Sequence, residues 1–406
     1  MKLLQINTGL NTSSTGKIVC QISKIFTDNG NESYIAFSGK YPENRDMENT
    51  IRVGFKLDFY WHALVTRIFD RHGFGSIRAT KKLLKKIDYI KPDIIHLHNL
   101  HGYYINIEIL FNYLARKEIP IVWTMHDCWS FTGHCSHFEF VDCNKWRESC
   151  YSCPQRSSYP SSLIKDNSKE NFLNKKRLFN SVHNMTIVPV SNWLDNKIKY
   201  SYLNGFKSRV IQNGIDLEVF KPSKSASFIN DYNLHNKFII LGVASVWTER
   251  KGFFEFFKLR ELLGGDFAIV LVGVSKKLQK MLPKNIISIS RTSDQAELAM
   301  IYSCADLYLN LTFEDTYPST NLESIACGTE VLTYKTGGSP ESIYKGCGYV
   351  VNQGDIDEVK VVIEEIKNKS KASTLLLTNI ANRKFDKNKN FNQYFKLYEE
   401  ILNTSQ

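Results

Sequence analysis

Two short segments in the C-terminal half of the sequence combine residue types that bind phosphate and sugar. In VWTERKGFFEF, Arg250 and Lys251 stand beside Gly252, at or just before the expected start of a helix. Two cations together with the N–H groups of a helix N-terminus suit a diphosphate. On this pair alone, a solvated basic turn is an equally good interpretation.

The second segment, LTFEDTYPSTNLESIACG, places carboxylates beside a turn that opens a helix. Asp315 follows an expected strand, and Glu323 falls in the first turn of the expected helix. Helix capping and the helix dipole account for Glu323, but not for two further acids beside an exposed Thr-Tyr-Pro turn. Carboxylates that accept hydrogen bonds from hydroxyls, next to N–H groups aimed at an anion, are what a nucleotide-sugar requires. The residues that open this helix are Pro318, Ser319, Thr320 and Asn321.

Strand and helix patterns alternate along the whole sequence, which is typical of parallel α/β sheets. The alternation restarts after an irregular Cys- and Ser-rich stretch, so we expect two α/β domains with ligands at the carboxyl ends of their strands. We expect residues 1–205 to form the first domain, with a Cys-rich insertion at about 128–160. Residues 206–380 should form the second domain. Residues 381–406 should form a C-terminal helix that packs back on the first.

The composition narrows the classes of protein that the chain can belong to. Its 406 residues are 43% hydrophobic and 23% charged, which is ordinary for a globular protein. No apolar run approaches the roughly 18–20 residues of a membrane span, and the N-terminus turns polar too early for a signal peptide. We therefore expect a cytoplasmic protein. The net charge, 52 − 41 = +11, suits nucleic acid, an anionic membrane or anionic small ligands, and part of it could be compositional drift.

Several motifs, in their order along the chain, resemble a known family. They are INTGLNTSSTGKI, IIHLHN, VWTMHD, VIQNGIDLEVFKP, ERKG and EDTYPSTNLESIACGTEVLTYKTGGSPE. The sequence looks like the retaining, nucleotide-sugar-dependent glycosyltransferases of group 1 (family 4). The resemblance implies the GT-B fold, in which two facing Rossmann-like domains with parallel sheets enclose a deep interdomain cleft. The Cys-bearing stretch from VWTMHDC resembles a branch found in bacterial capsule, O-antigen and colanic-acid synthesis.

The resemblance assigns roles to the C-terminal motif residues. The family's paired acids, seven residues apart, match Asp315, which would contact the donor sugar, and Glu323, which would contact the ribose. The turn at 318–321 would bind the diphosphate, and Lys251 matches the phosphate lysine. Two positions depart from the family pattern. The first acid of the pair is usually Glu, where this chain has Asp315. The family's phosphate lysine usually has a partner Arg five positions before it, where this chain has Val246, so Arg250 is expected to take over that charge.

Two residues of the N-terminal half also match the family. Gly16 matches a glycine loop that approaches the diphosphate, although Thr15 stands where the family usually has a first glycine. His126 matches a histidine that reaches the donor sugar; without the resemblance, a structural histidine beside Asp127 would be the better interpretation. His96 and His98 would share one face of a strand, and the family reading makes them line the cleft rather than bind metal.

The function implied by the resemblance is transfer of a sugar, hexosyl or N-acetylhexosaminyl, from a nucleotide-sugar to an oligosaccharide on polyprenyl diphosphate. Surface polysaccharide biosynthesis would place such an enzyme, peripherally bound, at the inner face of the cytoplasmic membrane. We expect no catalytic cofactor. The candidate membrane-facing surface combines an aromatic helix at 55–71 with a basic helix; its alternative is an ordinary solvated lysine face. The basic helix carries Lys81, Lys82, Lys85 and Lys86.

The cysteines suggest a separate structural question. Nine cysteines in a chain without a secretion signal argue against a disulfide framework. Four of them could hold a structural Zn²⁺ in a tetrahedron, with His134 and His137 in reserve, and buried thiols are the alternative. These four are Cys135, Cys143, Cys150 and Cys153.

Two rival functions use some of the same features. A basic, zinc-containing nucleic-acid-binding protein would explain the charge, but the basic residues are scattered and no RRM, KH or basic-helix signature is present, so we expect no nucleic-acid partner. A sugar phosphorylase or glycoside hydrolase would share the sugar-recognition chemistry. A hydrolase needs a second carboxylate flanking the bond, and none stands out in the N-terminal half.

Overall fold

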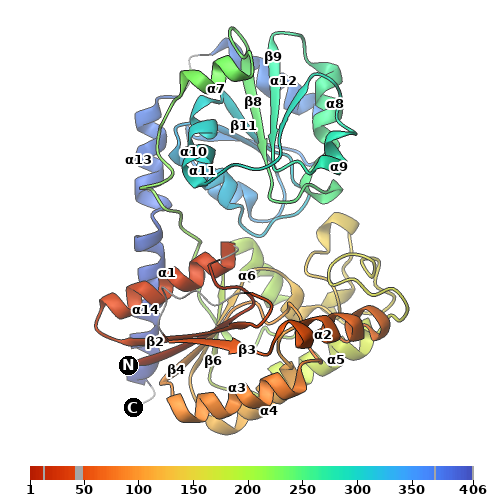
Figure 1. The fold of residues 1–406 in the computed structure, drawn as a ribbon, viewed down its shortest axis with the longest axis vertical. Helices are drawn as coiled ribbons and strands as arrows, with labels where there is room; N and C mark the ends of the chain where they lie inside the picture. Colours follow the sequence, from red (N-terminus) through yellow and green to blue (C-terminus); the bar gives the residue numbers. More distant parts are fainter. Residues whose placement is uncertain (12–13, 42–48, 370–371, 405–406) are drawn as a thin grey trace. The chain divides into compact units, whose positions relative to one another are not determined.

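The computed structural model describes residues 1–11, 14–41, 49–369 and 372–404. The chain divides into two compact units. The first contains Met1–Gln212 together with Phe391–Gln406, and the second contains Asn213–Asn390. Each unit is built on one parallel sheet with helices on both faces (Figure 1).

Seven parallel strands form the sheet of the first unit, in the order β3-β2-β1-β4-β5-β6-β7. Their apolar residues are buried almost without interruption, because a sheet covered by helices on both faces has no solvent side. The chain moves outward from β1 to β3 and then returns to β4, so β1 and β4 flank the topological switch point. The strands are β1 (Lys2–Asn7), β2 (Glu32–Ser38), β3 (Thr50–Val53), β4 (Ile94–Leu97), β5 (Ile121–Met125), β6 (Met185–Pro189) and β7 (Lys207–Ser208).

Helices cover both faces of this sheet. Helix α1 shares an apolar core with the C-terminal helix α14 over one face, and α3, α4 and α5 pack against one another over the other (Figure 1). The Cys-rich segment contains only short 3₁₀ turns in the described structure: η1 (Trp129–Phe131), η2 (Glu139–Val141) and η3 (Lys145–Arg147). The helices are α1 (Ser14–Asp28), α2 (Lys56–Phe69), α3 (Ile77–Ile90), α4 (Ile107–Lys117), α5 (Ser168–Phe179) and α6 (Asn192–Lys199).

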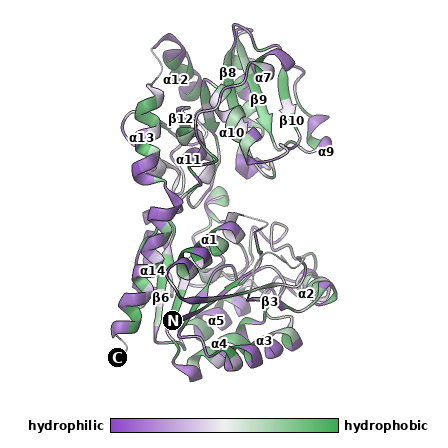
Figure 2. Cartoon of the chain, turned by 60° about the vertical axis from the view of Figure 1, so that its left-hand side comes forward, coloured by the Kyte–Doolittle hydropathy of each residue, from purple (hydrophilic) through white to green (hydrophobic). Residues whose placement is uncertain are grey.

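The second unit has six parallel strands in the order β10-β9-β8-β11-β12-β13, with its switch point between β8 and β11. Figure 2 shows the strands β8 and β9 in green, while purple follows the outer faces of the helices. The strands are β8 (Phe238–Val243), β9 (Phe267–Val272), β10 (Ile286–Ile289), β11 (Leu307–Asn310), β12 (Val331–Tyr334) and β13 (Gly348–Val351). The helices are α7 (Ala226–Asp231), α8 (Glu255–Leu262), α9 (Lys276–Gln279), α10 (Gln295–Cys304), α11 (Ser319–Ala326), α12 (Ile356–Asn368) and α13 (Thr374–Lys384), with 3₁₀ turns η4 (Glu249–Lys251) and η5 (Ser339–Ser342).

The unit boundaries differ from the expected ones. The first division lies after Gln212 rather than after residue 205, because β7 still pairs with β6 and extends the first sheet. The second unit continues to Asn390 rather than to residue 380, because α13 packs on α11.

The C-terminal segment forms two helices instead of the single helix expected at 381–406. The helical structure is interrupted after α13, where the Phe385 carbonyl accepts a hydrogen bond from the Ile215 N–H at 2.8 Å. Helix α14 (Lys387–Thr404) follows. Residues 405–406 lie outside the described residues. Helix α14 buries four side chains in the core of the first unit: Phe391, Tyr394, Leu397 and Tyr398.

Candidate active site

In the second unit, the expected phosphate- and sugar-binding residues lie at the switch point. Arg250 and Lys251 follow β8, and Glu314 and Asp315 follow β11, which is the neighbour of β8 in the sheet. The Lys251 Nζ lies 2.5 Å from Asp315 Oδ2. Open α/β sheets bind ligands at the carboxyl ends of the strands where the strand order reverses. Lys251 and Asp315 therefore lie at the position in the sheet where folds of this kind bind ligands.

Two glycines allow the acidic loop to fit between its neighbours. Gly252 (φ +72°) lies so close to the Leu311 carbonyl that a Cβ would collide with it, and Gly337 (φ +55°) lies equally close to the Asp315 carbonyl. The Gly338 N–H donates to that same carbonyl at 2.9 Å. Both glycines also have the left-handed backbone that side chains disfavour. The loop carrying Asp315 is thus fixed by backbone contacts on both sides.

Arg250 was expected to act on the diphosphate, and its observed contacts are with the protein. Its guanidinium donates to the Glu314 carbonyl at 2.5 Å, while its own carbonyl accepts from the Phe313 N–H at 2.8 Å. Arg250 therefore holds the acidic loop in place, and Lys251 is the cation at this site whose side chain meets a carboxylate. The Lys251 and Asp315 side chains are 28% and 18% exposed, so a ligand can compete for the pair.

The turn that opens α11 positions Glu323. The Ser319 hydroxyl donates to Glu323 Oε1 and the Tyr302 hydroxyl donates to Glu323 Oε2, both at 3.2 Å. Pro318 is the N-cap of α11, and the side chains of Ser319 and Thr320 are half-buried. Asn321 differs from the expectation, since its side chain is fully buried and contacts Asn310 and Ser342. Its amide packs α11 against the sheet.

In the first unit, a chain of hydrogen bonds connects Gln5 and His98 to His126. Gln5 Nε2 donates to the Val19 carbonyl at 3.0 Å, which leaves Gln5 Oε1 to accept from His98 Nε2 at 3.2 Å. His98 Nδ1 then accepts from His126 Nε2 at 3.1 Å. Burial lowers the pKa of His98 well below its usual value and lowers the pKa of His126 to about 4. Both rings are therefore neutral at pH 7, and the chain places the single proton of His126 on Nε2.

His96 and His98 do not line a cleft as expected, because both side chains are buried in the first unit. His96 Nδ1 lies 2.6 Å from the Tyr398 hydroxyl, and its Nε2 lies 2.7 Å from the Thr124 hydroxyl. The physical reason is α14, which brings Tyr398 and Tyr394 over β4 and covers the face that His96 would otherwise present.

The structure brings His101, Asp127 and Tyr159 together in a polar group that the sequence did not predict. His101 Nε2 lies 2.8 Å from Asp127 Oδ2, and His101 Nδ1 lies 3.0 Å from the Tyr159 hydroxyl. Burial opposes ionisation of Asp127, but the charge and hydrogen bond of His101 hold the pKa of that carboxyl below its usual range. The other Asp127 oxygen accepts from the Trp129 N–H at 2.9 Å. The HLHNLH and MHD motifs were visible signals for His101 and Asp127, whereas nothing in the sequence pointed to Tyr159.

Gly16 lies in the first turn of α1 and is buried. A Cβ there would stand 3.0 Å from the Asn11 nitrogen and 3.2 Å from the Gly9 oxygen. The absence of a side chain thus lets the loop after β1 approach the helix closely. Residues 12–13 of this loop lie outside the described residues.

Comparison with known proteins identifies the family. Residues 16–219 match the model described as Glycosyltransferase Family 4, and residues 225–391 match that described as Glycosyl transferases group 1. The chain belongs to the group 1, family 4 glycosyltransferases. It is also 22% identical over 298 residues to WcaC of Escherichia coli K12, named for colanic acid biosynthesis, covering 71% of each chain. The protein is therefore a glycosyltransferase, as the motifs indicated.

Solved structures confirm the GT-B fold. A sucrose-phosphate synthase from Thermosynechococcus elongatus matches with a TM-score of 0.74 and 15% identity over 100% of both chains. HepE of Anabaena, in complex with UDP-glucose, matches with a TM-score of 0.68 and 14% identity over 98% of this chain and 100% of that one. Within the residues described, no helix is long and apolar enough to cross a membrane.

The glycine beside Asp315 gives a test of this loop. Gly337→Ala should destabilise the protein by about 1–2 kcal/mol, because it adds a Cβ at positive φ against a fixed carbonyl. The thermal unfolding midpoint should fall by about 3 °C or more. Gly265→Ala is the matched control, since a Cβ there meets nothing within 4 Å. Equal midpoints for the two variants would show that the loop is not held as described.

Proposed function

We propose that the protein is a retaining glycosyltransferase that moves a hexosyl or N-acetylhexosaminyl group from a nucleotide-sugar to a lipid-linked oligosaccharide. The observation that carries this proposal is the meeting of Lys251, Asp315 and the start of α11 at the β8–β11 switch point. The similarity to WcaC supports a role in bacterial surface polysaccharide assembly, and the UDP-glucose complex of HepE supports the class of donor.

The arrangement of charges suits departure of a nucleoside diphosphate. As the glycosidic bond breaks, negative charge grows on the phosphate oxygens and positive charge grows near the anomeric carbon. Lys251 and the first N–H groups of α11 would stabilise the phosphate. When Lys251 turns to the phosphate, Asp315 is released to accept hydrogen bonds from sugar hydroxyls, and Glu323 is placed to bind the ribose.

Exchange of Lys251 from Asp315 to phosphate is energetically accessible. A partly exposed ion pair contributes only about 0–1 kcal/mol, so breaking it costs little compared with the charge-assisted contacts that replace it. Because Lys251 and the helix N-terminus supply the positive charge, we propose that catalysis needs no metal or other cofactor. Retention of configuration follows if the departing phosphate, held on one face, accepts the proton of the incoming hydroxyl.

His126 would contribute from the first unit as a hydrogen-bond acceptor. Its Nε2 carries the proton that His98 accepts, so its Nδ1 is the acceptor atom of the ring, and a hydroxyl is the kind of group that can donate to it. A sugar hydroxyl satisfies this requirement, whereas a phosphate oxygen does not. Gln5 and His98 are positioning residues in this scheme because they determine which nitrogen of His126 is protonated.

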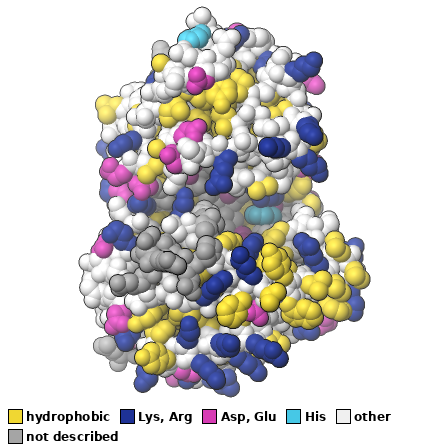
Figure 3. Space-filling model, in the orientation of Figure 1, with side chains coloured by type: hydrophobic (Ala, Val, Ile, Leu, Met, Phe, Trp, Pro, Cys, Tyr) yellow, Lys and Arg dark blue, Asp and Glu magenta, His cyan; other side chains and the backbone are white. Residues whose placement is uncertain are grey.

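The lipid-linked acceptor requires access to a membrane, and the first unit has a suitable surface. Helix α2 exposes large apolar side chains, among them Leu57 (82% exposed) and Trp61 (66% exposed). A loop adjoins the end of this helix, where the Leu163 N–H donates to the Arg67 carbonyl at 2.8 Å, and it exposes Leu163 and Ile164 as well. Figure 3 shows hydrophobic side chains gathered in the region where Figure 1 draws α2, with Lys and Arg side chains around them.

An apolar patch with a basic border fits the interface of an anionic membrane. The neighbouring helix α3 exposes its four lysines, and Lys165 and Lys40 lie over the aromatic rings of Phe69 and Phe59. We therefore propose peripheral binding to the inner face of the cytoplasmic membrane through α2, with the lysines of α3 adding attraction to acidic headgroups. These lysines are Lys81, Lys82, Lys85 and Lys86.

The role of Lys251 can be tested with purified enzyme and a panel of UDP-, GDP- and dTDP-sugars. Release of nucleoside diphosphate should occur without added divalent metal. Lys251→Met should lower kcat/KM at least about 100-fold, or about 2.7 kcal/mol, because the charge on the leaving group loses its cation. Lys277→Met, which removes an exposed lysine of α9, should leave kcat/KM unchanged. A dependence on Mg²⁺ or Mn²⁺, or full activity of Lys251→Met, would contradict the mechanism.

The hydrogen-bond chain makes a separate prediction about protonation. In protein labelled with ¹⁵N-histidine, NMR should show His126 protonated on Nε2 and neutral at pH 7. His126→Ala should lower turnover at least about tenfold (about 1.4 kcal/mol), and Gln5→Met should lower it as well while changing the His98 and His126 signals. Thr124→Val breaks the contact to His96 and serves as the control, with lower stability but normal turnover per folded molecule. Protonation of His126 on Nδ1 would refute this role.

Membrane binding can be measured by flotation with vesicles of phosphatidylglycerol and phosphatidylethanolamine. Leu57→Ser with Trp61→Ser should reduce binding at least about tenfold, since two large side chains lose burial in the interface. Reversing the charge of the four α3 lysines should also reduce binding and should remove its dependence on salt. Val361→Ser, at an exposed apolar position of α12, is the control. If the α2 double variant floats like the wild type, the proposed surface is wrong.

A further inference from the structure

The Cys-rich segment gathers thiols around one small cavity in the first unit. Cys135, Cys143, Cys150 and Cys153 all line it, together with apolar side chains that include Phe138 and Trp146. All four thiols are free rather than in disulfides. We propose that these four cysteines bind one Zn²⁺ as thiolates, with the buried side chains of Lys175 and His134 beside it. This proposal does not depend on the proposed function.

Two of the four sulfur atoms already receive backbone hydrogen bonds. Cys135 and Cys153 are hydrogen-bonded to each other. The Gly133 N–H donates to Cys150 Sγ at 3.2 Å, and the Gln155 N–H donates to Cys153 Sγ. Hydrogen bonds that orient ligand atoms form the surroundings typical of protein metal sites. Two of the four sulfurs are thus oriented by backbone donors from separate turns.

Lys175 is an unusual charge for the interior of a protein. Its side chain is buried, and its ammonium group donates to the carbonyls of Trp129 (2.8 Å) and Thr132 (3.1 Å). No carboxylate of the described residues pairs with it, and the acidic groups that act on it most strongly are the thiols of Cys150 and Cys135. A buried cation without a counter-charge is costly, and burial accordingly lowers the pKa of Lys175 to about 7. A zinc ion with four thiolates has charge +2 − 4 = −2 and would provide the missing anion.

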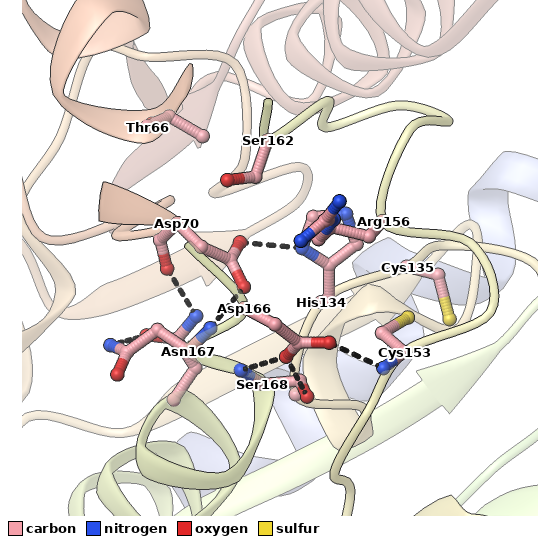
Figure 4. Close-up of polar contacts among 12 residues, drawn as sticks. Thr66, Asp70, His134, Cys135, Cys153, Arg156, Ser162, Asp166, Asn167 and Ser168 are labelled. Atoms are coloured by element: carbon pink, nitrogen blue, oxygen red, sulfur yellow. Dashed lines mark hydrogen bonds and ion pairs between the residues drawn. The ribbon is translucent and has the colours of Figure 1, made fainter. Parts of the chain in front are cut away.

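His134 lies on another side of the same cavity. Its Nδ1 lies 2.5 Å from Asp70 Oδ1, and both side chains are fully buried. Its Nε2 is buried and has no hydrogen-bond partner in the structure. Asp70 is itself held by the Asn167 N–H at 2.8 Å. Figure 4 shows His134 turned toward Asp70, with the side chains of Cys135 and Cys153 next to each other. His134 therefore brings a buried nitrogen without a hydrogen-bond partner to the wall of this cavity.

Zinc binding requires some closure of the cavity. Within the described residues, no group of three or more His, Cys, Asp and Glu side chains stands at metal-ligand spacing, so the four-thiolate site is not preformed. The sulfurs border one cavity, and the backbone between them contains only the short turns η2 and η3, so the proposed site requires these turns to move. A long irregular segment gains most from such a crosslink, because metal binding then contributes directly to its folding.

The crosslink would support the region next to His126. The Cys128 N–H donates to the Ser136 carbonyl at 3.1 Å, and the Trp129 N–H donates to Asp127. This hydrogen bond closes a loop that starts directly after His126 and Asp127, and Cys135 lies at the end of that loop, next to Ser136. Fixing Cys135 on zinc would hold this loop closed without placing the metal among the reacting groups.

The experiment measures metal content and its coordination in the full-length protein. After expression with zinc and dialysis, mass spectrometry of the metals should find about one zinc per chain. Addition of a mercurial should release it, detected with a chromogenic chelator, as the thiols react. The Co²⁺-substituted protein should show sulfur-to-cobalt charge transfer and the strong visible bands of a tetrahedral thiolate site. These measurements on the wild type need no variant to fold.

Variants then identify the ligands and their surroundings. Cys150→Ser with Cys153→Ser should reduce zinc below about a tenth per chain, whereas Cys304→Ser, in the second unit, should retain it. Lys175→Met should weaken zinc binding about 10-fold or more. Folded wild-type protein with less than about a tenth of a zinc per chain would overturn the proposal. A Cys135–Cys153 disulfide in protein prepared without oxygen would also overturn it. Loss of zinc with normal donor turnover would leave the proposed function intact, so the two can fail separately.

Discussion

The contact between the loops after β8 and β11 is the constraint on which the candidate site depends. Arg250 binds the backbone of the acidic loop, and Lys251 binds its carboxylate, so two adjacent cations perform different tasks. The contact of Arg250 is made to a backbone carbonyl, which a ligand does not easily displace. The exchangeable contact is made to Asp315, whose charge a phosphate can replace. This division explains how a loop can remain fixed while one of its ion pairs opens.

In the first unit, hydrogen bonds between neutral groups, rather than ion pairs, position His126. Around β1, β4 and β5 the polar side chains are deeply buried, and burial favours uncharged histidine. A chain of neutral donors and acceptors has a direction, because each ring carries one proton, and the amide of Gln5 fixes that direction at one end. The same switch-point geometry thus positions charged side chains in one unit and uncharged histidines in the other.

The features that the sequence predicted well are local. Strand–loop–helix patterns placed Lys251, Asp315 and Glu323 at strand ends and a helix start, and the order of motifs identified the fold and the family. The errors come from contacts between distant segments. His96 is buried because Tyr398, 302 residues away, packs against it, and Asn321 is buried because Asn310 and Ser342 surround it. No periodicity of a single segment encodes such pairings.

The buried charges suggest why the net charge of +11 is a poor guide to partners. Lys175 contributes to that sum but lies inside the first unit, and Arg250 contributes while bound to a carbonyl. The lysines of α3 count equally, although they are exposed and free to meet an anionic surface. Each cation experiences a different local dielectric, so its effect depends on burial and on the group it faces. The net charge alone therefore says little about binding, which depends on where accessible cations such as those of α3 and Lys251 lie.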